Sequence, residues 1–220
     1  MDEQALNFGQ QHEIFQASAA RSVTQIGAGQ VGSMVAPMLA KIGVTDLTIW
    51  DGDDIESHNI PMSLTWHTSD LGVMKVLALA KHVRAHSGVE ITAVPRMYAG
   101  EPLRDAVVVC VDTMEARQMI WRAAKESGLV DILIDTRVAS EYVSVFAIDP
   151  RDHDDRAYYE YFLRYKSGQA VRPTCGHHGI VYVASDAANA VLANLTNWWT
   201  NGRKKRHYKF LVGQLEQIQV

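Results

Sequence analysis

One stretch, residues 22–54, decides the fold, and it reads SVTQIGAGQVGSMVAPMLAKIGVTDLTIWDGDD. Its pattern predicts a strand, a glycine-rich turn, an apolar helix and a second strand, in that order. The two strands and the helix are expected at Ser22–Ile26, Leu47–Trp50 and Val31–Ile42. Gly43 follows the helix, at the position where glycine commonly ends one. A strand, a tight turn and a helix in this order are typical of an α/β protein with parallel strands.

The turn contains three glycines at G-x-G-x-x-G spacing, Gly27, Gly29 and Gly32, with Ala28 between the first two. Glycines let the backbone approach a phosphate closely, and the helix that follows presents unpaired N–H groups and the positive end of its dipole. Asp51 ends the second strand about 20 positions further on, where an acidic side chain reaches a ribose hydroxyl. The stretch therefore predicts a bound nucleotide, but it does not distinguish a dinucleotide from ATP.

Strands and helices continue to alternate after this stretch. The sequence predicts a helix, two strands, a helix and a strand at Ser69–His86, Val89–Val94, Asp105–Val111, Met114–Ser127 and Asp131–Asp135. Alternation of this kind predicts a Rossmann-like, doubly wound, mainly parallel sheet with right-handed crossovers. The run Asp105–Val111 is almost wholly apolar, as in strands buried on both faces.

The pattern changes in the C-terminal third, where we expect an antiparallel extension of the sheet. Its expected elements are a strand at Tyr142–Ile148, a short aromatic helix around Tyr158–Tyr165, a mobile crossover loop at 166–178, an alanine-rich helix at Gly179–Trp199 and a strand at Tyr208–Val212. Residues 1–20 are expected to form a helical N-terminal segment, and the chain, residues 1–220, is expected to be a single domain.

Composition excludes several classes of protein. A net charge of −4 gives no overall basic field for binding nucleic acid. The two cysteines, Cys110 and Cys175, form no C-x-x-C pair, so a zinc site made of cysteines is excluded. We expect no disulfide, no signal peptide and no membrane span, and hence a cytoplasmic protein.

The residues that follow Asp51 favour ATP over a dinucleotide. A polar loop with Asp53 and Asn59 leads to Lys75 near the start of a helix, from where a lysine can reach phosphates. Asp112 follows a buried strand, at the edge where open α/β sheets keep their ligands. A carboxylate beside a triphosphate is a natural ligand for Mg²⁺. Together these residues predict a site for ATP and Mg²⁺.

These motifs resemble the ThiF/MoeB family, the bacterial relatives of ubiquitin-activating enzymes. The family pattern has a glycine loop, D-x-D, N-x-x-R-Q, D-x-G-x-x-K and D-x-x-x-x-R in that order. The corresponding parts of this chain are GAGQVG, Asp51–Asp53, Asn59, Asp70–Lys75 and Asp112–Arg117. The resemblance covers about residues 22–199, and the combination of motifs is far more specific than the glycine loop alone.

The resemblance implies an ATP-dependent adenylyltransferase that activates the C-terminal carboxylate of a small ubiquitin-like or sulfur-carrier protein, and a homodimer. It implies that the nucleotide contacts Gly27, Ala28, Gly29, Gly32, Asp51, Asp53, Asn59 and Lys75. Asp112 is implied as the Mg²⁺ ligand, and Lys75 and Asp112 as catalytic residues. Cys175, in R-P-T-C-G, matches the cysteine that some members use to form a thioester, and packing at a helix start is its alternative reading.

The chain departs from the family pattern where Met62 and Ser63 replace the arginine and glutamine of N-x-x-R-Q. Arg137 is one candidate to replace the missing arginine, with an ion-paired arginine as the alternative. Met62 also motivates a second hypothesis, a partly degenerate member that binds nucleotide and partner without completing the reaction. A Rossmann NAD(P)-dependent oxidoreductase is a third, and it leaves Lys75 and Asp112 without a role. Adenylation of a small molecule or an RNA base also stays open.

Other clusters have simpler interpretations. His82 and His86 are spaced i, i+4 and are expected on a solvated helix face, because no third metal ligand is suitably spaced. His153–Asp155 is expected in a polar loop and Arg203–Arg206 in a solvated one. The tyrosines of the aromatic helix are interpreted as core packing, with a groove for an extended peptide tail as the alternative.

Overall fold

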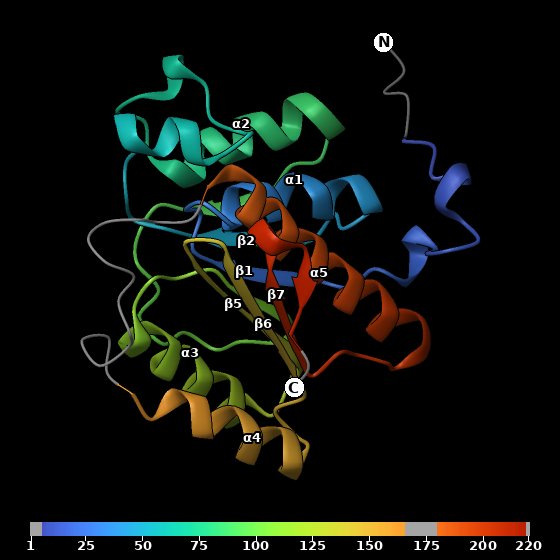
Figure 1. Cartoon of the computed structure of the whole chain (residues 1–220). Helices are drawn as coiled ribbons and strands as arrows, with labels where there is room; N and C mark the ends of the chain where they lie inside the picture. The colour runs from blue at the N-terminus through green and yellow to red at the C-terminus, as the bar shows by residue number, and fades with distance from the viewer. Residues whose placement is uncertain (1–5, 166–179, 219–220) are drawn as a thin grey trace.

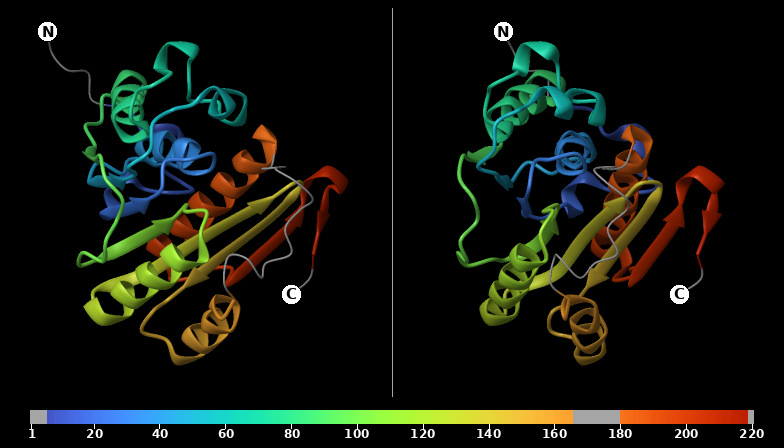
Figure 2. Two further views of the ribbon diagram at one scale, coloured as in Figure 1. Left: turned by 90° about the vertical axis from the view of Figure 1, so that its left-hand side faces the viewer. Right: turned by 60° about the vertical axis from the view of Figure 1, so that its left-hand side comes forward.

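The computed structural model describes residues 6–165 and 180–218, which form a twisted eight-stranded sheet covered by helices on both faces (Figures 1 and 2). The strand order is β3-β2-β1-β4-β5-β6-β7-β8. The first five strands in this order run parallel, and the last three are added antiparallel. The predicted Rossmann-like sheet with an antiparallel C-terminal extension is therefore confirmed.

The strands are β1 (Val23–Ile26), β2 (Leu47–Trp50), β3 (Thr92–Val94), β4 (Asp105–Val109), β5 (Val130–Ala139), β6 (Tyr142–Ile148), β7 (His207–Leu211) and β8 (Glu216–Gln217). The α-helices are α1 (Gly32–Ile42), α2 (Lys75–Ser87), α3 (Met114–Ser127), α4 (His153–Leu163) and α5 (Val181–Asn201). β5 is longer than predicted because it continues into a hairpin with β6, where Ala139 pairs with Tyr142. β8 was not predicted.

Two apolar cores cover the two faces of the sheet. One contains α1, α2 and α5, with buried residues such as Val35, Leu79 and Leu195. The other contains α3 and α4, with Trp121 and Tyr159. Figure 1 shows the same arrangement, with α1, α2 and α5 on one side of the strands and α3 and α4 on the other. The predicted core role of the aromatic helix is confirmed for Tyr159, which is 1% exposed and packs edge-on against Trp121, whereas Tyr161 and Tyr165 are exposed.

The prediction of a helical N-terminal segment was wrong for the residues described. They form two single turns of 3-10 helix, Gly9–Gln11 and Ala17–Ala19. Leu6 and Ile14 are exposed, and only Phe15 is buried, against Trp199. The apolar residues therefore do not form the continuous face that an α-helix needs for packing.

The helix predicted from Ser69 begins later, at Lys75. Gly72 has a φ of 78°, which a helix does not accommodate. The backbone around it pairs instead with the loop after β2: the Ile55 N–H donates to Val73 O at 2.9 Å, and the Lys75 N–H donates to Asp53 O at 2.9 Å. This pairing fixes Lys75 next to the D-x-D segment.

Of the two polar segments predicted as loops, one is helical, and the basic run Arg203–Arg206 is a loop as predicted, with Lys204 as its one largely buried residue. His153–Asp155 forms the first turn of α4, capped by Asp152, whose side chain accepts from the Asp155 N–H at 2.8 Å. In the basic run, Lys204 forms an ion pair with buried Asp155 at 2.8 Å and is itself largely buried. Among the described residues, no helix is long and apolar enough to cross a membrane.

Candidate functional site

The predicted site lies where the carboxyl ends of β2, β1 and β4 meet. The Gly27 N–H donates to Trp50 O at 2.8 Å, and the Cys110 N–H donates to Ile26 O at 2.7 Å. The glycine loop therefore sits between the ends of β2 and β4, on either side of β1. The chain leaves β1 toward β2, whereas β4 lies on the opposite side, so this is the switch point where open α/β sheets bind ligands.

The three glycines of the loop have different structural roles. Gly27 has a φ of 101°, and a Cβ there would lie 2.4 Å from Cys110 O. A Cβ on Gly32 would lie 2.1 Å from Gly27 O. A Cβ on Gly29 would meet nothing within 4 Å. Gly27 and Gly32 are thus required by the backbone itself, whereas Gly29 faces open space from which a phosphate can approach the loop.

This difference predicts that one alanine substitution lowers stability and the other lowers ATP affinity. Gly32→Ala should lower the free energy of unfolding by about 1–3 kcal/mol, because the new methyl group overlaps the Gly27 carbonyl. Gly29→Ala should leave stability within about 0.5 kcal/mol and weaken ATP binding. Urea denaturation and calorimetric titration with ATP measure the two quantities. Normal ATP affinity in a folded Gly29→Ala protein would contradict the placement of the phosphates.

Asp51 anchors the glycine loop to the end of β2. One carboxylate oxygen accepts from the Ala28 N–H at 2.7 Å, and the other accepts from the Asp53 N–H at 2.8 Å. Burial raises the pKa of Asp51, while the two N–H donors and the charge of Lys75 act in the opposite direction. Each oxygen keeps a lone pair beyond these bonds, so the carboxylate can still accept from a ribose hydroxyl.

Lys75 and Asp53 form an ion pair at the same edge, with 2.9 Å between Nζ and Oδ2. The lysine side chain is buried and the aspartate is exposed. Lys75 stands at the first position of α2, and its charge lowers the pKa of Asp51. The structure thus gathers Asp51, Asp53 and Lys75 beside the glycine loop.

Asn59 lies in a 3-10 helix, Ser57–Met62, that follows the D-x-D segment. Its side-chain oxygen accepts from the Glu56 N–H at 2.9 Å, which leaves the two amide hydrogens of the side chain outside that bond. Met62, which replaces the family arginine, is half-buried, whereas Ser63 is buried. The Ser63 hydroxyl lies 2.7 Å from the Ser33 hydroxyl in the first turn of α1.

A proline in α1 explains part of this hydroxyl network. Pro37 has no N–H, so the helix supplies no donor for the Ser33 carbonyl four residues earlier. The Thr65 hydroxyl donates to that carbonyl at 2.7 Å. The Thr65 N–H also donates to the Ser63 hydroxyl at 3.0 Å. The loop after Asn59 is thereby fixed against the helix that begins at the glycine loop.

Removing the Thr65 hydroxyl should therefore destabilise the protein. Thr65→Val keeps the shape of the side chain and leaves the buried Ser33 carbonyl without its donor, at an expected cost of about 1–3 kcal/mol in the free energy of unfolding. Thr92→Val, at an exposed strand position, is the matched control and should be near neutral. Equal melting temperatures for the two variants would disprove the role given to Thr65.

Asp112 is exposed and lies two residues beyond Cys110, whose carbonyl borders Gly27. Within the described part of the chain, no group of three or more His, Cys, Asp and Glu side chains could hold a metal ion unaided. Mg²⁺ commonly uses one or two carboxylates together with phosphates and water. A single exposed carboxylate beside the glycine loop fits a Mg²⁺ ion that a nucleotide brings with it.

Arg137 forms an ion pair inside the protein. This favours its interpretation as an ion-paired arginine over a replacement for the missing family arginine. Its Nε donates to Asp135 at 2.7 Å, and its guanidinium lies 4.6 Å from the centre of the Phe146 ring. One of its amino groups also donates to Phe162 O at 3.3 Å. Arg117, the arginine of D-x-x-x-x-R, donates from Nε to the other oxygen of Asp135 at 2.8 Å. The Asp135 carboxylate, 0% exposed, thus lies between two arginines.

Cys175 and the predicted mobile loop at 166–178 lie outside the described residues. Cys110 is a free cysteine that follows β4, and burial raises the pKa of its thiol to about 12. That thiol is therefore protonated at neutral pH.

The expectation of a solvated His82 was wrong. His82 is buried, and its Nε2 lies 2.7 Å from Asp70, the aspartate of D-x-G-x-x-K. The Asp70 carboxylate also accepts from the His67 N–H at 2.8 Å. These bonds to His67 and His82 hold the pKa of Asp70 low despite its burial. His86, four residues on, is exposed as predicted.

Sequence reasoning missed Gln25, whose side chain binds the backbone of the glycine loop. Its side chain is fully buried, and Nε2 donates to Gly27 O at 2.9 Å and to Gly32 O at 3.0 Å. Asp135 was seen as the end of a strand but not as an ion-pair centre. In both cases the available signal was a polar side chain within a strand of the sheet, since a buried polar side chain needs a partner.

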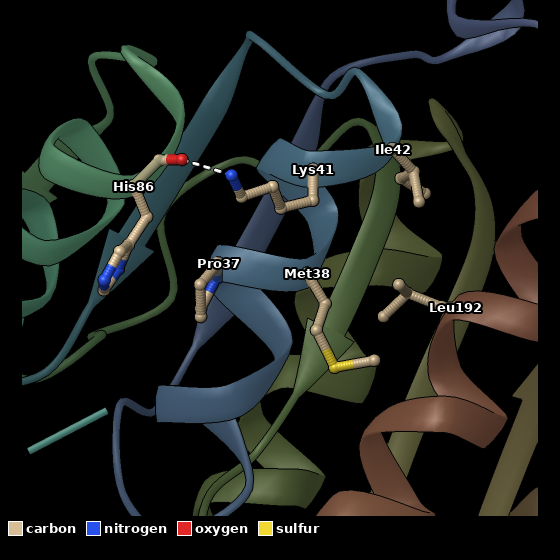
Figure 3. A pocket seen from close by; sticks show the side chains of 6 residues that line it. All are labelled: Pro37, Met38, Lys41, Ile42, His86 and Leu192. Atoms are coloured by element: carbon tan, nitrogen blue, oxygen red, sulfur yellow. Dashed lines mark hydrogen bonds between the residues drawn. The ribbon is translucent and has the colours of Figure 1, made fainter. Parts of the chain in front are cut away.

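A cavity of about 340 Å³ lies away from this edge, between α1, the end of α2 and α5 (Figure 3). Its lining residues are Pro37, Met38, Lys41, Ile42, His86 and Leu192. Lys41 Nζ donates to the His86 carbonyl across its rim. None of these residues belongs to the predicted nucleotide site.

The chain belongs to the ThiF family, whose model matches residues 3–214. It is 32% identical over 131 residues to ubiquitin-like modifier-activating enzyme 5 of Drosophila virilis, covering 50% of this chain and 32% of that enzyme. It is 30% identical over 102 residues to the sulfur carrier protein ThiS adenylyltransferase of Escherichia coli K12, covering 43% of this chain and 41% of that enzyme. The chain thus spans less than half the length of these relatives.

Solved structures share its fold. PaaA superposes with a TM-score of 0.71 at 16% identity, covering 99% of this chain and 76% of PaaA. E. coli MccB, crystallised with ATP, superposes with a TM-score of 0.72 at 12% identity, covering 92% of this chain and 63% of MccB. At these identities the likeness establishes the fold alone.

Proposed function

We propose that this protein is an ATP-dependent adenylyltransferase that activates the C-terminal carboxylate of a small ubiquitin-like or sulfur-carrier protein. One observation carries the proposal: the glycine loop, the D-x-D segment with Lys75, and the Asp112 segment converge at one edge of the sheet. The names of the curated relatives, a ubiquitin-like modifier-activating enzyme and a ThiS adenylyltransferase, support the same activity.

In the proposed reaction, a carboxylate oxygen of the carrier attacks the α-phosphorus of ATP. The new bond joins the carboxylate oxygen to the α-phosphorus, and the bond between the α-phosphorus and the oxygen bridging to the β-phosphate breaks, so that pyrophosphate leaves with the electron pair. The carboxylate is already ionised, so no general base is required, and the protein contributes mainly positioning and charge stabilisation. Gly29 admits the phosphates to the loop, Asp51 accepts from the ribose, and Lys75 and Asn59 donate to phosphate oxygens. Asp112 would hold Mg²⁺, and the ion would supply positive charge to neutralise the phosphates.

Lys75 must exchange partners to act in this way. Its Nζ is paired with exposed Asp53, and a triphosphate at the loop carries more negative charge than one carboxylate. The buried stem of Lys75 keeps the ammonium at the edge, so that a change of partner needs little movement. A cytoplasmic homodimer, and a later thioester on Cys175, complete the proposal as the family resemblance implies it.

A second candidate is a family member that binds nucleotide and carrier without completing the reaction. Met62 favours it, because a thioether replaces the arginine of N-x-x-R-Q and Arg137 is held by Asp135. An NAD(P)-dependent oxidoreductase is less consistent with the site, since it gives no role to Lys75 and Asp112.

ATP–pyrophosphate exchange distinguishes these candidates. The purified protein is incubated with ATP, Mg²⁺, labelled pyrophosphate and a panel of small carrier proteins ending in Gly-Gly. Carrier-dependent exchange, lost when the carrier lacks its last residue, is the result expected of an adenylyltransferase. ATP binding without exchange for any carrier would favour the non-catalytic candidate. NAD(P) binding in place of ATP would favour the oxidoreductase.

A further inference from the structure

Arg117 binds the backbone on both sides of Asp112. It projects from the second turn of α3 and is 6% exposed. One terminal nitrogen donates to the carbonyl of Val111, and the other donates to the carbonyl of Thr113 at 3.2 Å. The two peptide carbonyls that flank Asp112 in sequence are therefore held by a single guanidinium.

The same guanidinium is fixed from the opposite side by β5. Its Nε donates to Asp135 Oδ1 at 2.8 Å, and the nitrogen that binds Val111 also donates to Thr136 O at 3.0 Å. The Thr136 hydroxyl donates to Val109 O at 3.0 Å, at the end of β4. The segment from Val109 to Thr113 is thus tied to β5 at several points, while the Asp112 side chain is exposed.

We propose that Arg117 is the positioning residue for Asp112, holding its carboxylate at the glycine loop in the orientation in which it binds a nucleotide-bound Mg²⁺ ion. The inference rests on the proposed function, in which Asp112 is the metal ligand. Arg117 does not touch the ion. It acts by limiting the backbone conformations open to residue 112, so that less entropy is lost when the metal binds.

The geometry requires arginine and not simply a positive charge. Four hydrogen bonds leave the guanidinium in different directions, to a carboxylate and three carbonyls. A lysine would keep the charge opposite Asp135, but its compact ammonium cannot reproduce this fork. Arg117→Lys therefore tests positioning while the ion pair with Asp135 is largely kept.

Arg137→Lys is the matched control. Arg137 pairs with the same carboxylate, through Asp135 Oδ2, but its second hydrogen bond among the described residues goes to Phe162 O. Any general loss of stability from weakening the ion pairs of Asp135 with its two arginines should appear in both variants. A loss of Mg²⁺-dependent ATP affinity through Asp112 should appear in Arg117→Lys alone. Thermal melts monitored by circular dichroism verify that each variant is folded.

The test measures ATP affinity by calorimetry in the absence of carrier, once with excess Mg²⁺ and once with EDTA. In the wild type, Mg²⁺ should tighten ATP binding, and Asp112→Asn should remove most of that gain. Arg117→Lys should reduce the gain on the order of tenfold and leave the affinity in EDTA within about twofold of the wild type. Arg137→Lys should keep the full gain. Asp135→Asn, which retains Arg117, should lose part of the gain from Mg²⁺. This variant takes the place of Arg117→Lys in the test if Arg117→Lys does not fold.

A folded Arg117→Lys protein that keeps the wild-type gain from Mg²⁺, while Asp112→Asn loses it, overturns the positioning role and leaves the proposed function intact. An equal loss in Arg117→Lys and Arg137→Lys also overturns it, because the effect would then be one of general stability. If Asp112→Asn itself keeps the full gain, the assignment of the metal ligand fails, and the role of Arg117 fails with it.

Discussion

Replacing Asp112 with asparagine is expected to lower Mg²⁺-dependent adenylation by roughly 100-fold or more. A metal ion contributes several kcal/mol to charge stabilisation in the transition state, and each 1.36 kcal/mol corresponds to a factor of ten in rate. The Asp112 side chain is exposed, so its replacement should leave the fold intact. Pyrophosphate exchange at fixed Mg²⁺ measures the rate, and a thermal melt verifies the fold.

The matched control for this substitution is Asp154→Asn. Asp154 is an equally charged, exposed carboxylate in the first turn of α4, on the side of the sheet that carries α3. Its loss changes the net charge by the same amount and should leave exchange unchanged. Full activity in the Asp112→Asn protein would show that the reaction does not depend on this carboxylate, and the site as proposed would be wrong.

The largest effect on stability is expected for Asp135→Ala. The substitution removes the carboxylate between Arg117 and Arg137 and leaves two largely buried guanidinium groups without their partner. Breaking a buried ion pair by removing one side typically costs about 3–5 kcal/mol. Urea denaturation should show this loss as a lower midpoint with an unchanged dependence on urea concentration.

An exposed pair supplies the control for this experiment. Arg84 and Glu90 lie 2.9 Å apart, and about 70% of each side chain is exposed. Glu90→Gln should therefore cost less than about 1 kcal/mol. A loss for Asp135→Ala no larger than that for Glu90→Gln would mean that the two arginines find other partners or water, and the cluster would not be a structural centre.

The sequence was most informative where local patterns determine structure. The β-prone run before Gly27, the glycine spacing and the alternation of strands and helices predicted the parallel half of the sheet and its order of elements. Periodicity could not locate the start of α2, because Gly72 and pairing with the loop after β2 decide it. It also predicted a helical N-terminus, whereas the described residues form two turns of 3-10 helix and bury only Phe15, against Trp199.

The candidate site was predictable as a set of residues but not as a set of bonds. Motif spacing predicted that Asp51, Lys75 and Asp112 come together, because strand ends meet at one edge of a parallel sheet. It could not show that Asp51 already binds the Ala28 N–H, or that Asp135 holds both Arg117 and Arg137. Such long-range pairings depend on register and side-chain conformation, which a single sequence does not encode locally.

Met62 remains the residue at which this chain differs most from the family pattern, and it makes the chemical step the decisive point. The most direct measurement is to trap the activated carboxylate. A carrier ending in Gly-Gly is incubated with the protein, ATP, Mg²⁺ and hydroxylamine, and its C-terminus is analysed by mass spectrometry. The proposed function predicts a C-terminal hydroxamate that requires ATP and disappears in Asp112→Asn. An unmodified C-terminus, under conditions in which ATP and carrier both bind, would contradict it.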